Sequence, residues 1–183
     1  MTLVRSLFVV VLLLALPALA AERASRPRVS ANGAFSVRMV EQAPGKCSLE
    51  VSKDSGRVWA LERCVGAVDD LYFVSNDGQR VWILYPLAPK GTRKLPGKKA
   101  KKLPPWSNTV VAVELDAQGT RLEERSLLDF VGPKELTEVR QMAQHLKWLE
   151  GQLGVPGKGP RLTDAGRIEF ETVGGTRTHH LTF

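Results

Sequence analysis

Seven basic side chains lie between residues 90 and 102, and no acidic side chain interrupts them: Lys90, Arg93, Lys94, Lys98, Lys99, Lys101 and Lys102. Such a cluster attracts anions electrostatically and performs no covalent chemistry. Leu95, Leu103 and Trp106 add apolar groups that could enter a membrane interface or stack on a ligand. We therefore predict that this basic segment, together with Trp106, binds an anionic surface or partner. The alternative is a solvated hairpin tip that binds nothing in particular.

The charge of the chain is concentrated in this segment. The net charge is +7, yet without the seven basic residues and Arg5 the chain holds 18 basic and 19 acidic residues. A protein-wide basic surface of the kind that binds nucleic acid is therefore not indicated. We expect anionic lipid headgroups, an anionic polysaccharide or an acidic protein as the partner, with an attraction that salt screens.

No combination of residues marks an enzyme. There is no Gly-x-Ser-x-Gly motif, and no pattern around His145, His179 or His180 identifies an active histidine. The run GVPGKGP lacks the Lys-Ser/Thr ending and the preceding strand of a phosphate-binding loop. The pair Asp69-Asp70 has no further calcium ligands at loop spacing. We expect neither catalysis, nor a cofactor, nor a metal site.

The two cysteines, Cys47 and Cys64, predict a disulfide. An even number of cysteines favours a bridge in an oxidising compartment. Buried thiols or a redox pair are the alternatives, although the spacing is not that of a Cys-x-x-Cys motif. A bridge closing so short a loop would stabilise the fold by about 3 kcal/mol.

The N-terminus has the layout of a secretory signal. Arg5 precedes an uncharged run that extends from Ser6 to Ala21 and contains Ala18-Leu19-Ala20, a small-residue cleavage site. An uncleaved anchor is the alternative, but the run is shorter than the about 20 residues that span a bilayer. We predict cleavage after Ala20, no transmembrane span thereafter, and export to the periplasm or the medium of a presumed bacterium.

Five short motifs that favour turns are distributed along the rest of the chain. Asp, Asn and Gly favour tight turns between strands, and they occur at Asn32-Gly33, Asp54-Ser55-Gly56, Asp77-Gly78, Asp116–Gly119 and Asp164–Gly166. Flanking runs such as GRVWALE and NTVVAVEL are rich in the β-branched and aromatic residues of strands. The intervals between the turns predict about five hairpin units with two insertions.

The centre of the predicted sheet is the apolar run from Val81 to Tyr85, which indicates a strand buried on both faces. Residues 109–115 are its expected antiparallel partner, so the basic segment would be the tip of the hairpin between them. The run SNDGQRVWIL resembles the turn-and-strand unit of β-propeller blades, but five hairpins are too few to close a propeller. We predict a mainly β fold of antiparallel hairpin repeats, arranged as a sandwich, an open barrel or a partial propeller.

One amphipathic α-helix is expected at residues 133–151. Gly132-Pro133 suits a helix start, and apolar residues at spacings of three and four form one stripe: Leu136, Val139, Ala143, Leu146, Leu149 and Leu153. The stripe would pack on the sheet or, alternatively, bind a partner, with His145 and Trp148 on its flanks.

The predicted organisation is a signal peptide (1–20), a flexible lead-in (21–31) and one β-rich domain (32–183) with a basic insertion at 88–106. The function that we expect is that of an exported, non-enzymatic β-domain that binds an anionic envelope component through the basic segment. The alternative is a structural or protein-interaction module that uses its sheet or helix surface, with the basic segment incidental. The oligomeric state is not indicated.

Overall fold

The computed structural model of the chain describes residues 22–90, 103–151, 159–175 and 177–183, and antiparallel strands dominate it. The predicted signal peptide lies outside these residues. Four sheets are formed, none of which closes on itself in the part of the chain described. The mainly β, antiparallel prediction is confirmed.

The outer sheet has the order β1-β3-β4-β5, with β2 also paired to β3. Its strands are β1 (Arg23–Ala24), β2 (Arg28–Val29), β3 (Phe35–Ala43), β4 (Lys46–Lys53) and β5 (Gly56–Leu61). The expected flexible lead-in thus contributes two short strands: Arg23 pairs with Glu41, and Arg28 pairs with Val37. The pairing supplies partners for backbone groups that a free segment would leave to water.

The central sheet has the order β10-β9-β7-β6. Its strands are β6 (Leu71–Val74), β7 (Arg80–Leu84), β9 (Val110–Asp116) and β10 (Arg121–Ser126). The predicted pairing of the Val81 run with residues 109–115 is confirmed, because β7 and β9 are antiparallel neighbours with Ile83 opposite Val113.

Two three-stranded sheets complete the fold. The small sheet contains β8 (Leu87–Pro89), β12 (His145–Lys147) and β11 (Arg140–Gln141), in the order β11-β12-β8. The C-terminal sheet contains β13 (Arg161–Leu162), β14 (Ile168–Glu171) and β15 (Thr178–Leu181). In the described part of the chain, three 3-10 turns join the elements: η2 (Pro105–Asn108), η3 (Leu127–Asp129) and η4 (Glu135–Glu138).

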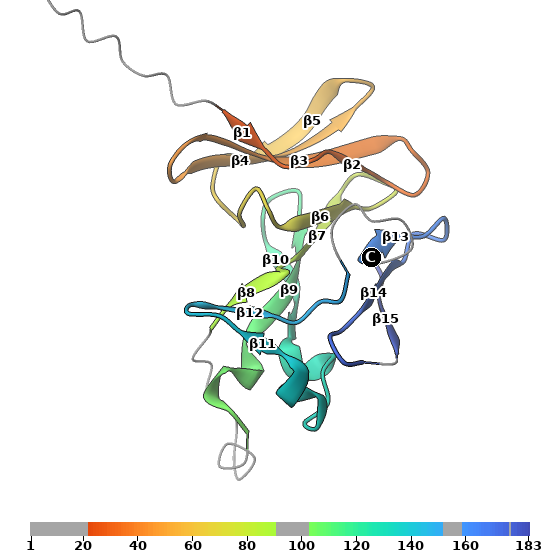
Figure 1. Cartoon of the computed structure of the whole chain (residues 1–183). Coiled ribbons are helices and arrows are strands. Elements are labelled where there is room, and N and C mark those ends of the chain that lie inside the picture. The colour runs from red at the N-terminus through yellow and green to blue at the C-terminus, as the bar shows by residue number, and fades with distance from the viewer. Residues whose placement is uncertain (1–21, 91–102, 152–158, 176) are drawn as a thin grey trace, which may run out of the picture.

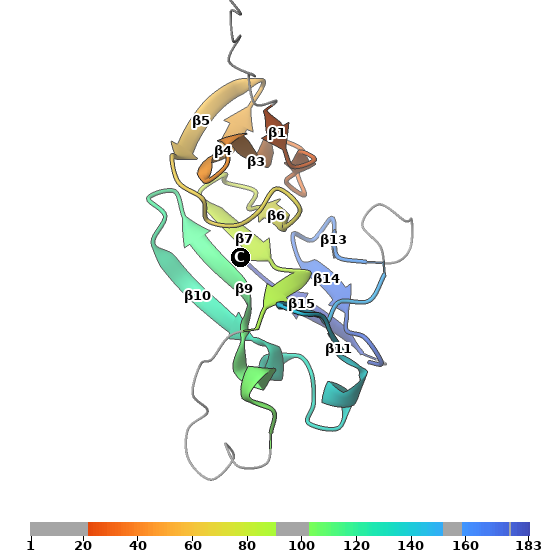
Figure 2. The ribbon, with the colours of Figure 1, turned by 60° about the vertical axis from the view of Figure 1, so that its left-hand side comes forward.

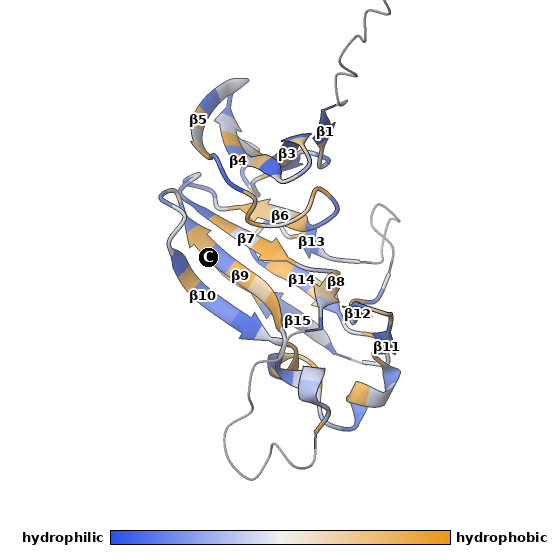
Figure 3. Cartoon of the chain, turned by 90° about the vertical axis from the view of Figure 1, so that its left-hand side faces the viewer, coloured by the Kyte–Doolittle hydropathy of each residue, from blue (hydrophilic) through white to orange (hydrophobic). Residues whose placement is uncertain are grey.

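The central sheet is covered on both faces (Figures 1 and 2). Val81 and Ile83 of β7 pack in a cluster with residues of the outer sheet, whereas Trp82 and Leu84 pack in a second cluster with the small and C-terminal sheets. Side chains alternate between the faces of a strand, so a strand between two cores must be apolar throughout. Figure 3 shows hydrophobic colour over much of β7. The prediction of a strand buried on both faces is confirmed.

All five predicted turns join antiparallel strands. They connect β2 to β3, β4 to β5, β6 to β7, β9 to β10 and β13 to β14. Gly33, Gly78, Gly119 and Gly166 have φ between 70° and 78°, the left-handed conformation that glycine adopts without steric cost. A sixth turn at Gly45 joins β3 to β4 and was not predicted.

The predicted helix at 133–151 is wrong. The segment forms the single turn η4, then β11 and β12, and Leu149 makes a β-bridge to Thr172. The physical reason is the burial of Trp148, which is fully enclosed and donates its indole N–H to the Tyr85 carbonyl at 2.7 Å. A helix with the Leu136–Leu149 stripe inward would leave this large side chain on its flank.

Candidate anion-binding face

The two ends of the basic segment are held together at its root. Lys90 follows β8, and its backbone N–H donates to the Gln144 carbonyl at 3.0 Å. At the other end, the hydroxyl of the buried Thr109 donates to the Pro89 carbonyl at 2.6 Å. Lys90 and Thr109, on the two sides of the segment in sequence, are therefore both attached to strands of the small sheet or their ends.

Of the seven predicted basic residues, Lys90 is described by the structure and is half-buried. Arg93, Lys94, Lys98, Lys99, Lys101 and Lys102 lie outside the described residues, so their predicted role stays a prediction. Trp106 lies in η2, half-buried against the core cluster that contains Trp82 and Trp148. Its ring is therefore available to a ligand only in part.

The small sheet carries a cationic outward face. Leu146 and Ala88 are fully buried, so the alternating positions of β12 and β8 point away from the core. In register across this outward face, Arg140 of β11 lies opposite Lys147 of β12, and Lys147 lies opposite Leu87 of β8. The same face is completed by Pro89, Met142 and His145, and it carries no acidic residue. Together with Lys90, these six residues are called the cationic face below.

Among the residues that the structure describes, the lysines and the arginine of this face have no carboxylate partner. Within residues 22–90, 103–151, 159–175 and 177–183, no ion pair involves Lys90, Arg140 or Lys147. Cross-strand placement of two like charges such as Arg140 and Lys147 is unfavourable in the absence of an anion. The face is thus arranged to gain from a negative partner.

The outer sheet shows the opposite arrangement. Arg38 donates two hydrogen bonds to its cross-strand neighbour Glu50, at 2.9 and 2.8 Å. Arg23 pairs with Glu41 at 3.1 Å, and Arg57 pairs with Glu62 at 3.6 Å. Three arginines of that sheet are therefore paired with carboxylates within the molecule, which reduces the attraction of these three for an external anion.

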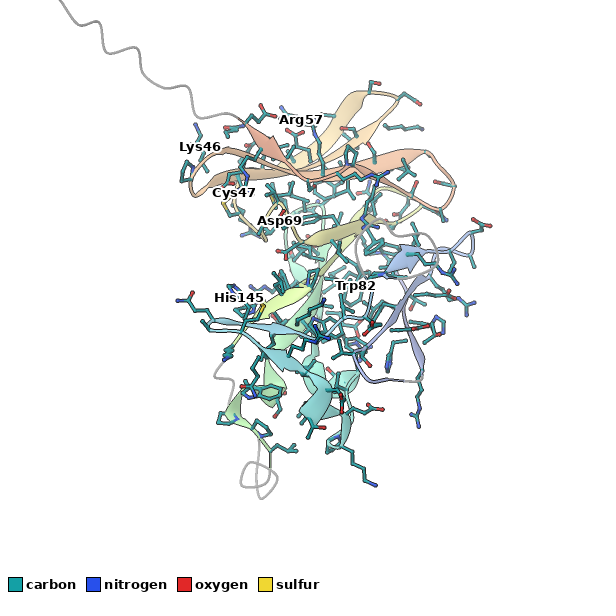
Figure 4. The ribbon with its side chains drawn as sticks, in the orientation of Figure 1. Lys46, Cys47, Arg57, Asp69, Trp82 and His145 are labelled. Atoms are coloured by element: carbon teal, nitrogen blue, oxygen red, sulfur yellow. A yellow bond between two sulfur atoms is a disulfide. The ribbon has the colours of Figure 1, made fainter. Side chains whose placement is uncertain are left out.

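One acidic group that interacts with the cationic face lies in the loop between β5 and β6. Burial raises the pKa of Asp70 to about 6, and the charge of His145 opposes this rise. The Asp70 carboxylate accepts a hydrogen bond from the Ala67 N–H at 2.7 Å. Figure 4 labels His145 in the small sheet and, above it in the view, Asp69, which directly precedes Asp70 in the chain.

Three contacts attach the loop between β5 and β6 to the sheets. The predicted Cys47–Cys64 disulfide is present. The Tyr72 hydroxyl donates to the Ala67 carbonyl at 2.6 Å, and the Tyr85 hydroxyl donates to the Val65 carbonyl at 3.2 Å. The loop that carries Asp70 is therefore fixed relative to both the outer and the central sheet.

The histidines at the C-terminus have structural surroundings. His179 packs its ring against Phe130 and Phe170, and burial lowers its pKa. His180 approaches Glu169 at 3.6 Å, where Arg161 also binds the carboxylate. Among the described residues, no group of three or more His, Cys, Asp or Glu could hold a metal ion.

Two hollows were not foreseen from the sequence. One of about 210 Å³ lies beside the disulfide, between Arg63, Tyr85 and Arg121. A second of about 190 Å³ lies next to the cationic face, between Leu87, Lys147 and Leu149. Both join residues from distant parts of the chain, for which spacing along the sequence carries no signal.

The comparisons with known proteins supply no relative. No family model, no curated protein and no solved structure matches this chain. No helix within the described ranges is long and apolar enough to cross a membrane.

Proposed function

We propose that this protein is an exported, non-enzymatic β-domain that binds an anionic component of the cell envelope through the cationic face and the basic segment that starts from it. Export is supported by the Cys47–Cys64 disulfide, since such bonds persist in oxidising compartments. It is also supported by the signal-like sequence of residues 1–20.

The observation that carries the proposal is the contrast between the two exposed sheet surfaces. Arg23, Arg38 and Arg57 of the outer sheet pair with carboxylates, whereas the cations of the cationic face do not within the described residues. Six more basic residues follow Lys90 in the sequence. Unpaired charge of one sign at one place favours binding of the opposite charge.

The test is retention on a heparin matrix and on anionic vesicles at low and physiological salt. Replacement of the seven basic residues of the segment by Gln should abolish retention, because each Lys or Arg near an anionic surface contributes about 1 kcal/mol. The control variant Lys46→Gln/Arg167→Gln removes two exposed cations away from the face and should be retained like the wild type. Unchanged retention of the seven-fold variant would overturn the proposal.

A second candidate function is a protein-interaction module that uses the edges of its sheets. β5 and β10 are edge strands, and they expose the apolar side chains of Val58 and Leu122. Exposed edges can accept a strand from another protein. This candidate predicts that deletion of residues 91–102 leaves partner capture intact, whereas Val58→Lys and Leu122→Lys abolish it.

A further inference from the structure

The cationic face also exposes apolar side chains. Leu87 is 46 % exposed, and Met142 is 50 % exposed, at the start of β8 and after β11 respectively. Leu87 lies directly across from Lys147, which lies across from Arg140. The Met142 N–H donates to the His145 carbonyl at 2.9 Å, which holds Met142 on the outward side of the β11–β12 turn. Apolar and cationic groups are thus interleaved on one surface.

An apolar hollow adjoins this surface. Leu87 and Lys147 form one side of the hollow, and its other residues are Leu71, Pro86, Leu149, Glu150, Gly151 and Pro160. Leu71 and Leu149 belong to the core, so the floor of the hollow is hydrocarbon. Its volume is about 190 Å³. An apolar group that enters would replace water on a hydrocarbon surface, which is favourable.

We propose that the cationic face and this hollow dock onto an anionic lipid bilayer. This inference rests on the proposed function and names its ligand. Arg140, Lys147 and Lys90 contact the headgroups, while Leu87 and Met142 enter the interface and apolar lipid atoms reach the hollow.

The interleaving of charge and apolar area selects lipid over a polysaccharide. A sulfated or carboxylated polysaccharide would satisfy Arg140 and Lys147 but offer no hydrocarbon to Leu87, Met142 or the hollow. Interfacial binding combines buried apolar area with attraction to anionic headgroups, and this surface provides both.

Two acidic groups act against the docking and limit its strength. Glu150 is exposed at the rim of the hollow, and Asp70 lies close enough to His145 to be affected by its charge. The three cations Lys90, Arg140 and Lys147 outnumber these two acidic groups by one. The other six basic residues of the basic segment add to the positive charge.

The experiment is co-sedimentation of the full chain with vesicles of phosphatidylglycerol and phosphatidylcholine (3:7) and, separately, with vesicles of phosphatidylcholine alone. Retention on heparin is measured in parallel. Leu87→Ser/Met142→Ser should lower the vesicle partition coefficient about tenfold or more, while heparin retention stays at the wild-type level. The matched control Val58→Ser/Leu122→Ser removes equally exposed apolar groups from other strands and should bind vesicles normally. Circular dichroism and thermal unfolding verify that both variants are folded.

The outcomes separate this inference from the proposed function. Wild-type vesicle binding by Leu87→Ser/Met142→Ser, or heparin retention without any vesicle binding by the wild-type protein, overturns bilayer docking and leaves anion binding standing. Failure of the wild-type protein to bind either probe overturns both. Equal loss in the control variant also overturns the inference, because the effect would then not belong to this face.

Discussion

The hydroxyl of Thr109 donates a hydrogen bond to the carbonyl of Pro89 at 2.6 Å, across 20 residues of chain. Thr109 is buried where β9 begins, and Pro89 ends β8. The bond joins Pro89, which precedes the basic segment in the chain, to Thr109, which follows it.

Replacement of Thr109 by Val should lower the free energy of unfolding by about 1 kcal/mol, because the shape is kept and the bond to the Pro89 carbonyl is lost. Urea unfolding measures the change. Thr178→Val is a suitable control, since this exposed side chain lies in β15 and the substitution should change the free energy by less than about 0.5 kcal/mol. Equal effects of the two substitutions would show that the bond does not stabilise the root.

Replacement of Trp148 by Phe should lower the free energy of unfolding by about 2 to 4 kcal/mol. The substitution creates a cavity beside Phe130 and Phe170, and it leaves the Tyr85 carbonyl without its indole donor. The half-buried Trp106 is the matched control, and Trp106→Phe should cost less than about 1 kcal/mol. A small effect at Trp148 would argue against the strand pairing of β12 and in favour of an exposed helix flank.

Asp70 should make stability depend on pH. Burial raises its pKa from 3.8 to about 6 in the folded protein, so folding disfavours the ionised form. The contribution of Asp70 to the free energy of unfolding is therefore most favourable below pH 4. It declines as the pH rises toward 6, by at most about 3 kcal/mol.

Asp70→Asn tests this dependence, because the amide oxygen can still accept from the Ala67 N–H but carries no charge. The variant should be more stable than the wild type at pH 7 and equally stable at pH 4, as measured by urea unfolding at both pH values. A gain that is equal at pH 4 and pH 7 would contradict the assigned cause.

Alanine substitutions at Gly78 and Gly33 should distinguish the energetic cost of steric crowding from the cost of backbone strain. Both have left-handed φ, of 70° and 72°, but a Cβ at Gly78 would lie 2.4 Å from the Phe35 ring, whereas one at Gly33 would meet nothing within 4 Å. Gly33→Ala should cost about 1 kcal/mol from the conformation alone. Gly78→Ala should cost at least about 1 kcal/mol more, from overlap with the ring. Thermal or urea unfolding of the two variants measures the difference.

The turns and the central strand could be predicted because their causes are local. Asp77-Gly78 and Asp116–Gly119 have the residue types that tight turns require, and the chain does reverse at both. The run from Val81 to Leu84 is continuously apolar, and such a run needs a core on each side. The disulfide followed from the count of cysteines, since two in an oxidising compartment have one pairing.

The segment 133–151 could not be assigned in the same way. Leu136, Leu146 and Leu149 fit a helical stripe, but Leu146 and Trp148 also alternate as a strand does. The neighbours decided between the two: β8 offers backbone partners to β12, Thr172 offers one to Leu149, and a pocket between Phe130 and Phe170 encloses Trp148. A sequence pattern contains none of these distant partners.

The same distinction between local and tertiary causes applies to the candidate site. The sequence by itself determined the number of clustered cations and their position along the chain, because charge is a property of each residue. Only the tertiary structure decided that Arg140 and Lys147 lie side by side without carboxylate partners in the described chain, with Leu87 next to them. The reason is that pairing between strands, rather than spacing along the chain, determines which charges share a surface.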